Sequence, residues 1–232
     1  MFEQMNNNKV HLEGRILTLP RLSHQVYDEN FYEIDLEVPR LSESVDIIPI
    51  TISEKLLSEN SFDVGKTIAI NGQFRSYNKQ VDGKSKLVLT VFVRELTQAK
   101  VESNTNTIEL VGFICKEPIY RTTPFKREIC DVLVAVNRAY NKSDYLPCIA
   151  WGRNARFAKN LDVGEKVSII GRIQSRGYEK KLENGDIQKR TAYEISIIKL
   201  NKFSSLDKVA EAPFNLISAQ QTMDTTNYTG TN

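Results

Sequence analysis

The sequence predicts an all-β protein made of two tandem, five-stranded Greek-key barrels with a flexible C-terminal tail. Three observations support this fold class: an internal repeat over most of the chain, short runs of alternating apolar and polar residues, and only one short helical pattern per repeat. Two copies at this period indicate tandem domains rather than a solenoid. The chain has 232 residues, 41% of them hydrophobic, which is enough for two cores of this kind.

The repeat has a period of about 98 residues, and its blocks keep the same order and spacing in both copies. The matched blocks are 8–16 with 106–114, 31–40 with 129–138, 48–50 with 146–148, 63–72 with 162–171, and the apolar runs 87–93 and 193–200. We therefore predict a first, divergent and acidic domain at residues 1–97 and a linker at 98–105. A second, basic domain follows at 106–203, and a tail rich in Ser, Thr, Asn and Gln at 204–232.

Within each repeat the pattern predicts three strands, a short helix and two further strands. Strict alternation in 33–38 is typical of a half-buried strand, and the run 132–136 indicates a more buried one. The helical segments are 53–57, where Ser53 can act as the N-cap, and 154–161.

Turn residues complete the pattern. An Asp-Gly pair at 82–83 and an Asn-Gly pair at 184–185 favour a long hairpin between the last two strands of each repeat. This order of elements in about 95 residues is that of an OB-fold. An SH3-like barrel or half of a β-sandwich remains the alternative.

Composition excludes several classes of protein. No run approaches the ~20 apolar residues of a membrane span, and the N-terminus lacks the pattern of a secretory signal. Cys115, Cys130 and Cys148 are odd in number and form no CxxC pair, which argues against a disulfide framework and a structural zinc site. We expect reduced cysteines packed as small core residues in a soluble, intracellular protein without a membrane partner.

No motif for catalysis stands out. The two histidines, His11 on a strand and His24 in a predicted loop, have no ligand-spaced partners. There is no phosphate-binding glycine loop, no nucleophile elbow and no paired-carboxylate motif. We therefore predict no catalytic residues, no metal, no cofactor and no enzymatic activity.

Charge is distributed unevenly along the chain. Residues 1–105 carry 12 basic and 15 acidic side chains, a net −3, whereas residues 106–202 carry 18 basic and 11 acidic, a net +7. A compact segment of this charge is typical of a polyanion-binding surface, with an ordinary solvated basic face as the alternative.

Aromatic and basic residues interleave in the second repeat. Cations that follow phosphates and flat rings that stack on unpaired bases are what single-stranded nucleic acid requires. The predicted nucleic-acid-binding residues are Arg121, Arg138, Tyr140, Tyr145, Trp151, Arg153, Arg156, Arg172, Arg176, Tyr178, Lys180 and Lys181, with Tyr77 from the first repeat; Lys126 and Arg127 lie in the same stretch. Tyr120 and Phe157 are assigned to core or rim packing.

The second repeat resembles the bacterial single-stranded DNA-binding protein family. The resemblance is carried by Leu110–Gly112, Glu117–Arg121, the AVNR segment 135–138, the AWG segment 150–152 and Gly171–Ile173. It implies four base-stacking positions, at Tyr140, Tyr145, Trp151 and Tyr178. In the first repeat these positions correspond to Ser42, Ile47, Ile52 or Ser53, and Tyr77, so we expect that copy to bind more weakly or to serve assembly.

The resemblance also implies a function and partners. We expect a cytoplasmic, nucleoid-associated protein that binds single-stranded DNA without sequence preference in replication, recombination or repair. Four OB-folds around the strand would require a homodimer. The tail lacks the acidic, apolar tip with which the family recruits replication proteins. One alternative is therefore a primosome-like, plasmid or phage replication adaptor that mainly binds proteins, and another is RNA binding by the same surface.

Overall fold

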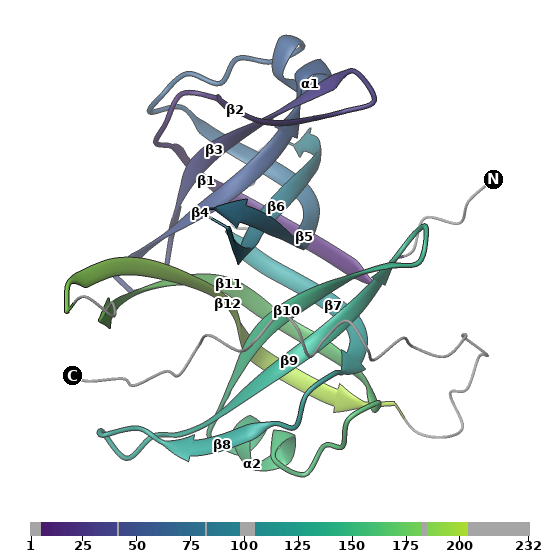
Figure 1. Cartoon of the computed structure of the whole chain (residues 1–232), viewed down its shortest axis with the longest axis vertical. Helices are drawn as coiled ribbons and strands as arrows, with labels where there is room; N and C mark the ends of the chain where they lie inside the picture. Colours follow the sequence, from purple (N-terminus) through teal and green to yellow (C-terminus); the bar gives the residue numbers. More distant parts are fainter. Residues whose placement is uncertain (1–5, 41, 82, 98–104, 182–184, 204–232) are drawn as a thin grey trace.

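The computed structural model describes residues 6–40, 42–81, 83–97, 105–181 and 185–203. It contains two β-barrels, one above the other in Figure 1. The first is built from β1 (Asn8–Ile16), β2 (Arg21–Val26), β3 (Glu29–Pro39), β4 (Val45–Ser53), α1 (Glu54–Ser58), β5 (Thr67–Val81) and β6 (Lys84–Thr97). The second is built from β7 (Asn106–Ile114), β8 (Ile119–Thr122), β9 (Glu128–Arg138), β10 (Lys142–Trp151), α2 (Arg153–Ala158), β11 (Lys166–Lys181) and β12 (Ile187–Lys202).

Both barrels have the OB-fold topology that the pattern predicts. In the first, β1 pairs antiparallel with β3 and β5, and the parallel pair β4–β6 closes the barrel. In the second, β7 pairs with β9 and β11, and β10–β12 is the closing parallel pair. Ser53 caps α1 as expected, because its side chain accepts a hydrogen bond from the Leu56 amide. The domain boundaries stay a prediction, and the tail and all of the linker except Thr105 lie outside the described residues.

Each repeat contains one short strand that the sequence pattern did not predict. β2 pairs with β3, and β8 pairs with β9, each as an edge strand outside the barrel. Every residue of β2 is exposed or half-buried, so the strand has no apolar face and shows no period of two. His24, expected in a loop, lies on β2.

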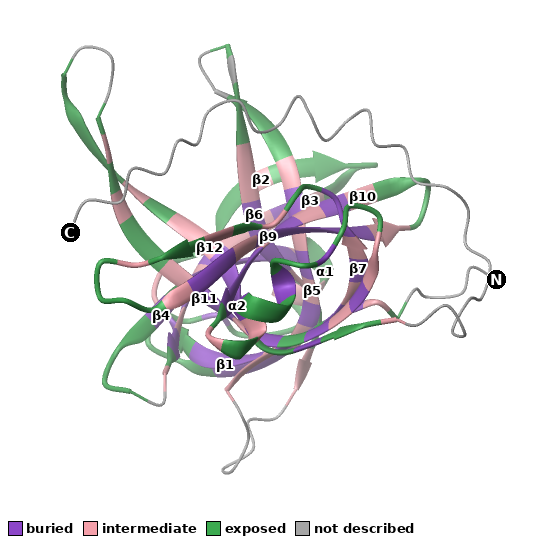
Figure 2. Cartoon of the chain, turned by 90° about the horizontal axis from the view of Figure 1, so that it is seen from below, coloured by how far each residue is buried: buried purple, intermediate pink, exposed green. Residues whose placement is uncertain are grey.

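The core is continuous through both barrels. Leu12, Ile34 and Phe74 of the first barrel and Ile108 and Ile173 of the second belong to one cluster and are fully buried. Figure 2 shows buried residues lining the inside of the barrels and exposed residues along the two long hairpins, β5–β6 and β11–β12. The three cysteines are buried, as predicted for small core residues. None of the helices among the described residues is long and apolar enough to cross a membrane.

The barrels are joined edge to edge by their first strands. β1 and β7 pair antiparallel, with Val10 opposite Ile108, its own counterpart in the repeat. The pairs on either side are reciprocal: Asn8 faces Leu110, and Leu12, the counterpart of Leu110, faces Asn106, the counterpart of Asn8. A pseudo-twofold axis therefore passes through the Val10–Ile108 pair, and a single sheet of 12 strands runs through both barrels.

Side chains beside this ladder repeat the symmetry. Asn7 donates from Nδ2 to the Asn137 carbonyl at 2.8 Å, and its counterpart Thr105 donates from Oγ1 to the Pro39 carbonyl at 3.2 Å. Each of these hydrogen bonds joins one barrel to the other. The residues that precede β1 and β7 are therefore held at the two edges of the interface.

Two buried aspartates fasten the barrels at sites we call the Asp46 seam and the Asp144 seam. Asp46 on β4 accepts from the Ser175 amide on β11 at 2.7 Å, and Asp144 on β10 accepts from the Ser76 amide on β5, also at 2.7 Å. Both carboxylates are fully buried. A buried carboxylate without partners is costly, so each seam requires the facing barrel to be in place.

Replacing Asp46 by Ala is expected to lower the free energy of unfolding by about 3–5 kcal/mol, since the change leaves buried cationic and amide groups unpaired. Glu37→Ala, which removes the exposed ion pair with Arg15, should cost less than about 1 kcal/mol. Urea unfolding measures both values, and equal losses would contradict the assigned importance of the Asp46 seam.

Gly171 marks a close backbone approach within the second barrel. A Cβ atom there would lie 2.5 Å from the Ser196 carbonyl oxygen, whereas nothing lies within 4 Å of a Cβ on Gly177 of the same strand. Gly171→Ala is therefore expected to cost about 1–3 kcal/mol of stability through overpacking. Gly177→Ala should stay within about 0.5 kcal/mol of the parent. Thermal or urea unfolding of the two variants checks this difference.

Candidate nucleic-acid interface

The strands β10, β12 and β11 present one continuous outer face on the second barrel. Tyr145 and Trp151 are six residues apart on β10, so their side chains lie on the same side of the sheet. The Trp151 indole donates from Nε1 to Ser196 Oγ on β12 at 3.2 Å. Ser196 pairs with Arg172 on β11, which places Trp151 and Arg172 on the same face.

The four predicted stacking residues differ in exposure. Tyr140 is 81% exposed on the turn between β9 and β10, and Trp151 is 37% exposed. Tyr178 is half-buried on β11, on the same side of the strand as Arg172. Tyr145 is half-buried against a small cluster of Cys115, Leu133 and Ala135. Tyr145, Trp151 and Tyr178 therefore share the outer face, and Tyr140 stands at its edge.

Most of the predicted cations on or near this face contact carboxylates. Arg121 on β8 lies 2.7 Å from Asp131, Arg156 on α2 lies 3.5 Å from Glu128, and Arg176 on β11 lies 3.7 Å from Glu194. The side chains of these three arginines are at least 44% exposed, so their ion pairs are weak and a phosphate can compete for them. Arg153 and Lys181 are exposed, and Lys180 is half-buried.

Two of the predicted cations contact the buried aspartates of the seams. Arg138 on β9 contacts Asp144 at 3.4 Å within the second barrel, and Arg172, which shares the outer face with Trp151, reaches Asp46 of the first barrel at 3.3 Å. The sequence pattern could not predict the contact of Arg172, because it forms only when the two barrels are paired.

The corresponding face of the first barrel is acidic. Glu33, Asp35 and Glu37 alternate along β3, where β9 carries Asp131, Leu133 and Ala135. The carboxylates contact arginines: Glu33 and Asp35 contact Arg21, and Glu37 contacts Arg15. Because this stripe repels phosphate, the first barrel is the poorer surface for a polyanion.

Tyr77, the predicted aromatic of the first barrel, belongs to a ring cluster. Its ring centroid is 6.2 Å from that of His24, which stacks on Phe31 at 5.1 Å. Phe31 in turn lies 5.6 Å from Phe92 on β6. Phe92 was not predicted as a site residue, since one phenylalanine in an apolar strand gives no distinguishing signal.

A second unpredicted aromatic lies at the tip of the β8–β9 hairpin. Phe125 is 86% exposed, and the turn that presents it is fixed by a 2.8 Å bond from the Lys126 amide to the Thr123 carbonyl. The equivalent tip of the first barrel carries Tyr27, which is 99% exposed. Lys126 and Arg127 follow Phe125, whereas Asp28 and Glu29 follow Tyr27. The sequence signal for Phe125 was a proline-containing turn with adjacent cations.

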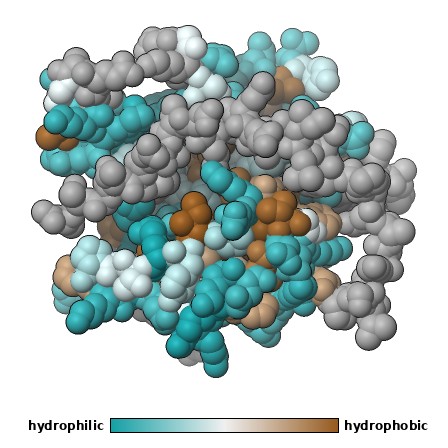
Figure 3. All heavy atoms as spheres, turned by 60° about the horizontal axis from the view of Figure 1, so that its bottom comes forward, coloured by the Kyte–Doolittle hydropathy of each residue, from teal (hydrophilic) through white to brown (hydrophobic). Residues whose placement is uncertain are grey.

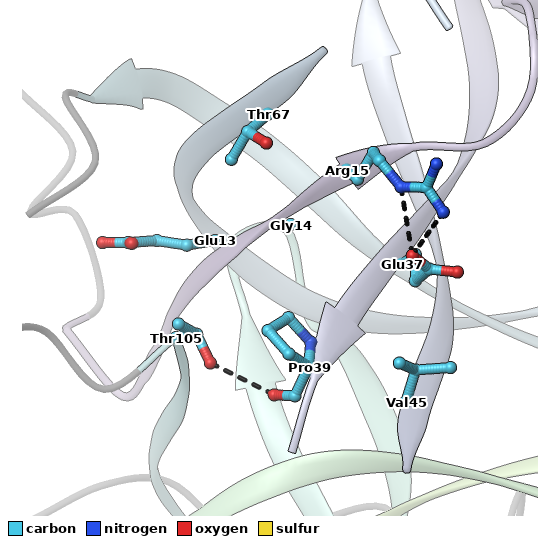
Figure 4. A pocket seen from close by; sticks show the side chains of 8 residues that line it. All are labelled: Glu13, Gly14, Arg15, Glu37, Pro39, Val45, Thr67 and Thr105. Carbon is cyan, nitrogen blue, oxygen red and sulfur yellow. Dashed lines mark hydrogen bonds and ion pairs between the residues drawn. The ribbon is translucent and has the colours of Figure 1, made fainter. Parts of the chain in front are cut away.

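Figure 3 shows the molecule with the lower end of Figure 1 brought forward, and the described residues on that face are largely hydrophilic, with a few hydrophobic groups among them. A hollow on the first barrel, beside Gly14 and Thr67, is shown in Figure 4. It holds the Arg15–Glu37 ion pair and the hydrogen bond from Thr105 to Pro39, and none of the predicted site residues lines it.

The cysteine thiols are held protonated. Burial raises the pKa of Cys130 to about 11 and that of Cys115 to about 12, and it also raises the pKa of Cys148. A protonated thiol is a poor nucleophile and a poor metal ligand. Within residues 6–203, as far as they are described, no three His, Cys, Asp or Glu side chains come together in a group that could hold a metal ion.

Comparison with known proteins shows that the second barrel is similar in sequence to one protein family. Residues 105–203 match the sequence model of the "Single-strand binding protein family". Single-stranded DNA-binding protein 1 of Staphylococcus aureus (strain COL) is 35% identical over 83 residues, which are 33% of this chain and 50% of that protein. Single-stranded DNA-binding protein A of Bacillus subtilis (strain 168) is 32% identical over 83 residues, 33% of this chain and 48% of that protein. The chain thus spans about half the length of the curated relatives it matches.

A solved structure extends the similarity of fold to both barrels. The wild-type single-stranded DNA-binding protein from Thermus aquaticus superposes with a TM-score of 0.66, covering 89% of this chain and 96% of that chain. The sequence identity of 18% makes this a statement about fold alone. Residues 105–203 are therefore similar in sequence to the Single-strand binding protein family, and both barrels share the fold of a solved single-stranded DNA-binding protein.

Proposed function

We propose that this protein binds single-stranded DNA without sequence preference, in the cytoplasm, during replication, recombination or repair. The binding is non-enzymatic. Bases stack on Tyr140, Tyr145, Trp151 and Tyr178, and phosphates are neutralised by the arginines and lysines of the second barrel. The match of residues 105–203 to the family model and the names of the similar proteins support this proposal.

The shared face of Tyr145, Trp151 and Tyr178 is the single observation that carries the proposal. Three rings on one side of one sheet, with arginines between them, form a path on which bases can stack in succession. Stacking uses the π-face that every base has, so this arrangement tolerates any sequence. Replication proteins and a second copy of the chain, which would bring four OB-folds together, are the partners we propose.

Titration with oligo-dT should quench the fluorescence of Trp151, because this residue is the only tryptophan in the chain. Stacking contributes about 1–3 kcal/mol per base. A Trp151→Ala/Tyr178→Ala variant should therefore bind labelled oligo-dT at least about 30-fold more weakly. Anisotropy measures the affinity, and the urea midpoint verifies the fold. Binding without quenching in the parent, or full affinity in the variant, would refute the stacking assignment. Tighter binding of poly-U would favour RNA.

The exposed hairpin tips offer a matched pair of variants. Phe125→Ala is expected to weaken oligo-dT binding by about five- to tenfold, since it removes a ring flanked by cations and near Trp151. Tyr27→Ala removes an equally exposed ring beside Asp28 and Glu29 and should leave the affinity unchanged. Both side chains are almost free of contacts, so neither change should alter the urea midpoint. Equal effects of the two variants would contradict a role for Phe125.

A further inference from the structure

The two seams between the barrels are equivalent in their backbone contacts but not in their charge. At the Asp46 seam, Arg40 donates to the carboxylate through Nε at 2.8 Å and Nη2 at 2.6 Å, and Arg172 adds a third contact at 3.3 Å. Each arginine of that seam thus hydrogen-bonds Asp46 directly. This seam holds one positive charge in excess of its carboxylate, and both guanidinium groups are occupied.

The Asp144 seam holds more positive charge than its carboxylate can neutralise. Arg138 Nε lies 3.4 Å from Asp144 Oδ2. Arg75 on β5 lies near Arg138 and Asp144, and Arg94 on β6 lies beside Arg75. Burial, Arg94 and Arg138 lower the pKa of Arg75 to about 10. The cluster of these three guanidinium groups and one carboxylate has a formal excess of two positive charges.

Hydrogen bonding within this cluster is incomplete. Within the part of the chain that the structure describes, Arg75 and Arg94 form no ion pair; each donates from Nη2 to Gln73 Oε1, at 2.9 Å and 3.1 Å. The Nε atom of Arg75 is buried without a hydrogen-bond partner there. Arg138 Nε and Asp144 Oδ2 form an ion pair with each other at 3.4 Å but no hydrogen bond. Like charges held together with donors unsatisfied are the condition in which an anion is most favourably bound.

An aromatic ring orients two of the guanidinium groups. The Arg75 Cζ atom lies 4.0 Å from the centroid of the Phe92 ring, and the Arg94 Cζ atom lies 5.1 Å from it. A guanidinium whose face is stacked keeps its N–H edge for a planar or tetrahedral oxyanion. Phe92 also continues into the ring cluster of Phe31, His24 and Tyr77 described above.

The arginine cluster lies where a DNA strand that leaves the second barrel would reach the first barrel. Arg138 pairs with Lys142 at the base of the β9–β10 hairpin, whose turn exposes Tyr140. Across the seam, the Ser76 amide bonds to Asp144, so β5 and its Arg75 lie directly beside β10. In the order Tyr140, Arg138, Arg75, Phe92, two cations lie at the boundary between the barrels, with a ring on either side.

We propose that Arg75, Arg94 and Arg138 form a phosphate-binding site that leads single-stranded DNA from the second barrel to the first across the Asp144 seam. The inference rests on the proposed function, since it concerns the path of the strand. It also gives the acidic first barrel a limited nucleic-acid surface, confined to β5 and β6 and away from the carboxylate stripe of β3.

The test compares two oligonucleotide lengths. Oligo-dT of about 10 nucleotides fits one barrel, and oligo-dT of about 30 spans both. The parent binds both lengths. Arg75→Gln/Arg94→Gln should weaken the longer complex at least about fivefold and leave the shorter within about twofold. The slope of log affinity against log salt should fall by about 1.4 for the longer oligomer, which corresponds to two phosphate contacts. Lys55→Gln/Lys66→Gln removes two exposed cations near α1 and should change the affinity for neither oligonucleotide.

Three results would overturn the inference. An equal loss of affinity for both oligonucleotides would mean that the arginines belong to the binding site of a single barrel. Unchanged affinity for the longer oligonucleotide would mean that the arginines do not lie on the path of the DNA. Unchanged binding in Arg75→Gln/Arg94→Gln, together with a loss in Arg172→Gln that is confined to the longer oligomer, would move the crossing to the Asp46 seam. If the double variant does not fold, Arg94→Gln, at an exposed position, should lower the slope by about 0.7 for the longer oligomer. A parent that binds neither length refutes the proposed function itself, a result distinct from the other three.

Discussion

The antiparallel pairing of β1 with β7 is the constraint on which the rest of the molecule depends. It sets a pseudo-twofold axis through Val10 and Ile108, and from that axis follow the reciprocal bonds of Asn7 and Thr105. The same axis brings each buried aspartate against a serine amide of the other barrel. The burial of these charges is tolerable only in the paired state, so the interface fixes the orientation of both OB-folds.

The two barrels are related by a pseudo-twofold axis, but their outer faces differ. The outer face of the second barrel presents rings and exposed cations, whereas the same face of the first barrel presents carboxylates on β3 that are partly neutralised by Arg15 and Arg21. The two copies differ in charge at these outward positions, whereas inward positions such as Leu12 and Leu110 are apolar in both copies. The two barrels therefore present unequal surfaces to a polyanion.

The internal repeat and the period-two alternation were sufficient to predict the barrels, the helices and the buried cysteines. They could not reveal β2 or β8, since these edge strands bury no apolar face. The predicted stacking residues were chosen from the AVNR and AWG segments, but their exposure could not be predicted, because Tyr145 packs on Cys115 from a distant part of the chain. The contact of Arg172 with Asp46 joins the two barrels, whereas Arg138 contacts Asp144 and Arg75 stacks on Phe92 between neighbouring strands of one barrel. No local sequence pattern encodes any of these three contacts.

The distance along the chain between the two central strands has a consequence for biosynthesis. β1 leaves the ribosome long before its partner, because Ile108 follows Val10 by almost the whole first repeat. At about 5–20 residues per second the interval is about 5–20 s. Throughout it, the nascent first barrel carries an open strand edge that could pair with another copy on the same polysome. The charged residues Lys9 and Glu13 at that edge oppose such cross-chain association until translation supplies β7. The interval of only seconds also limits it.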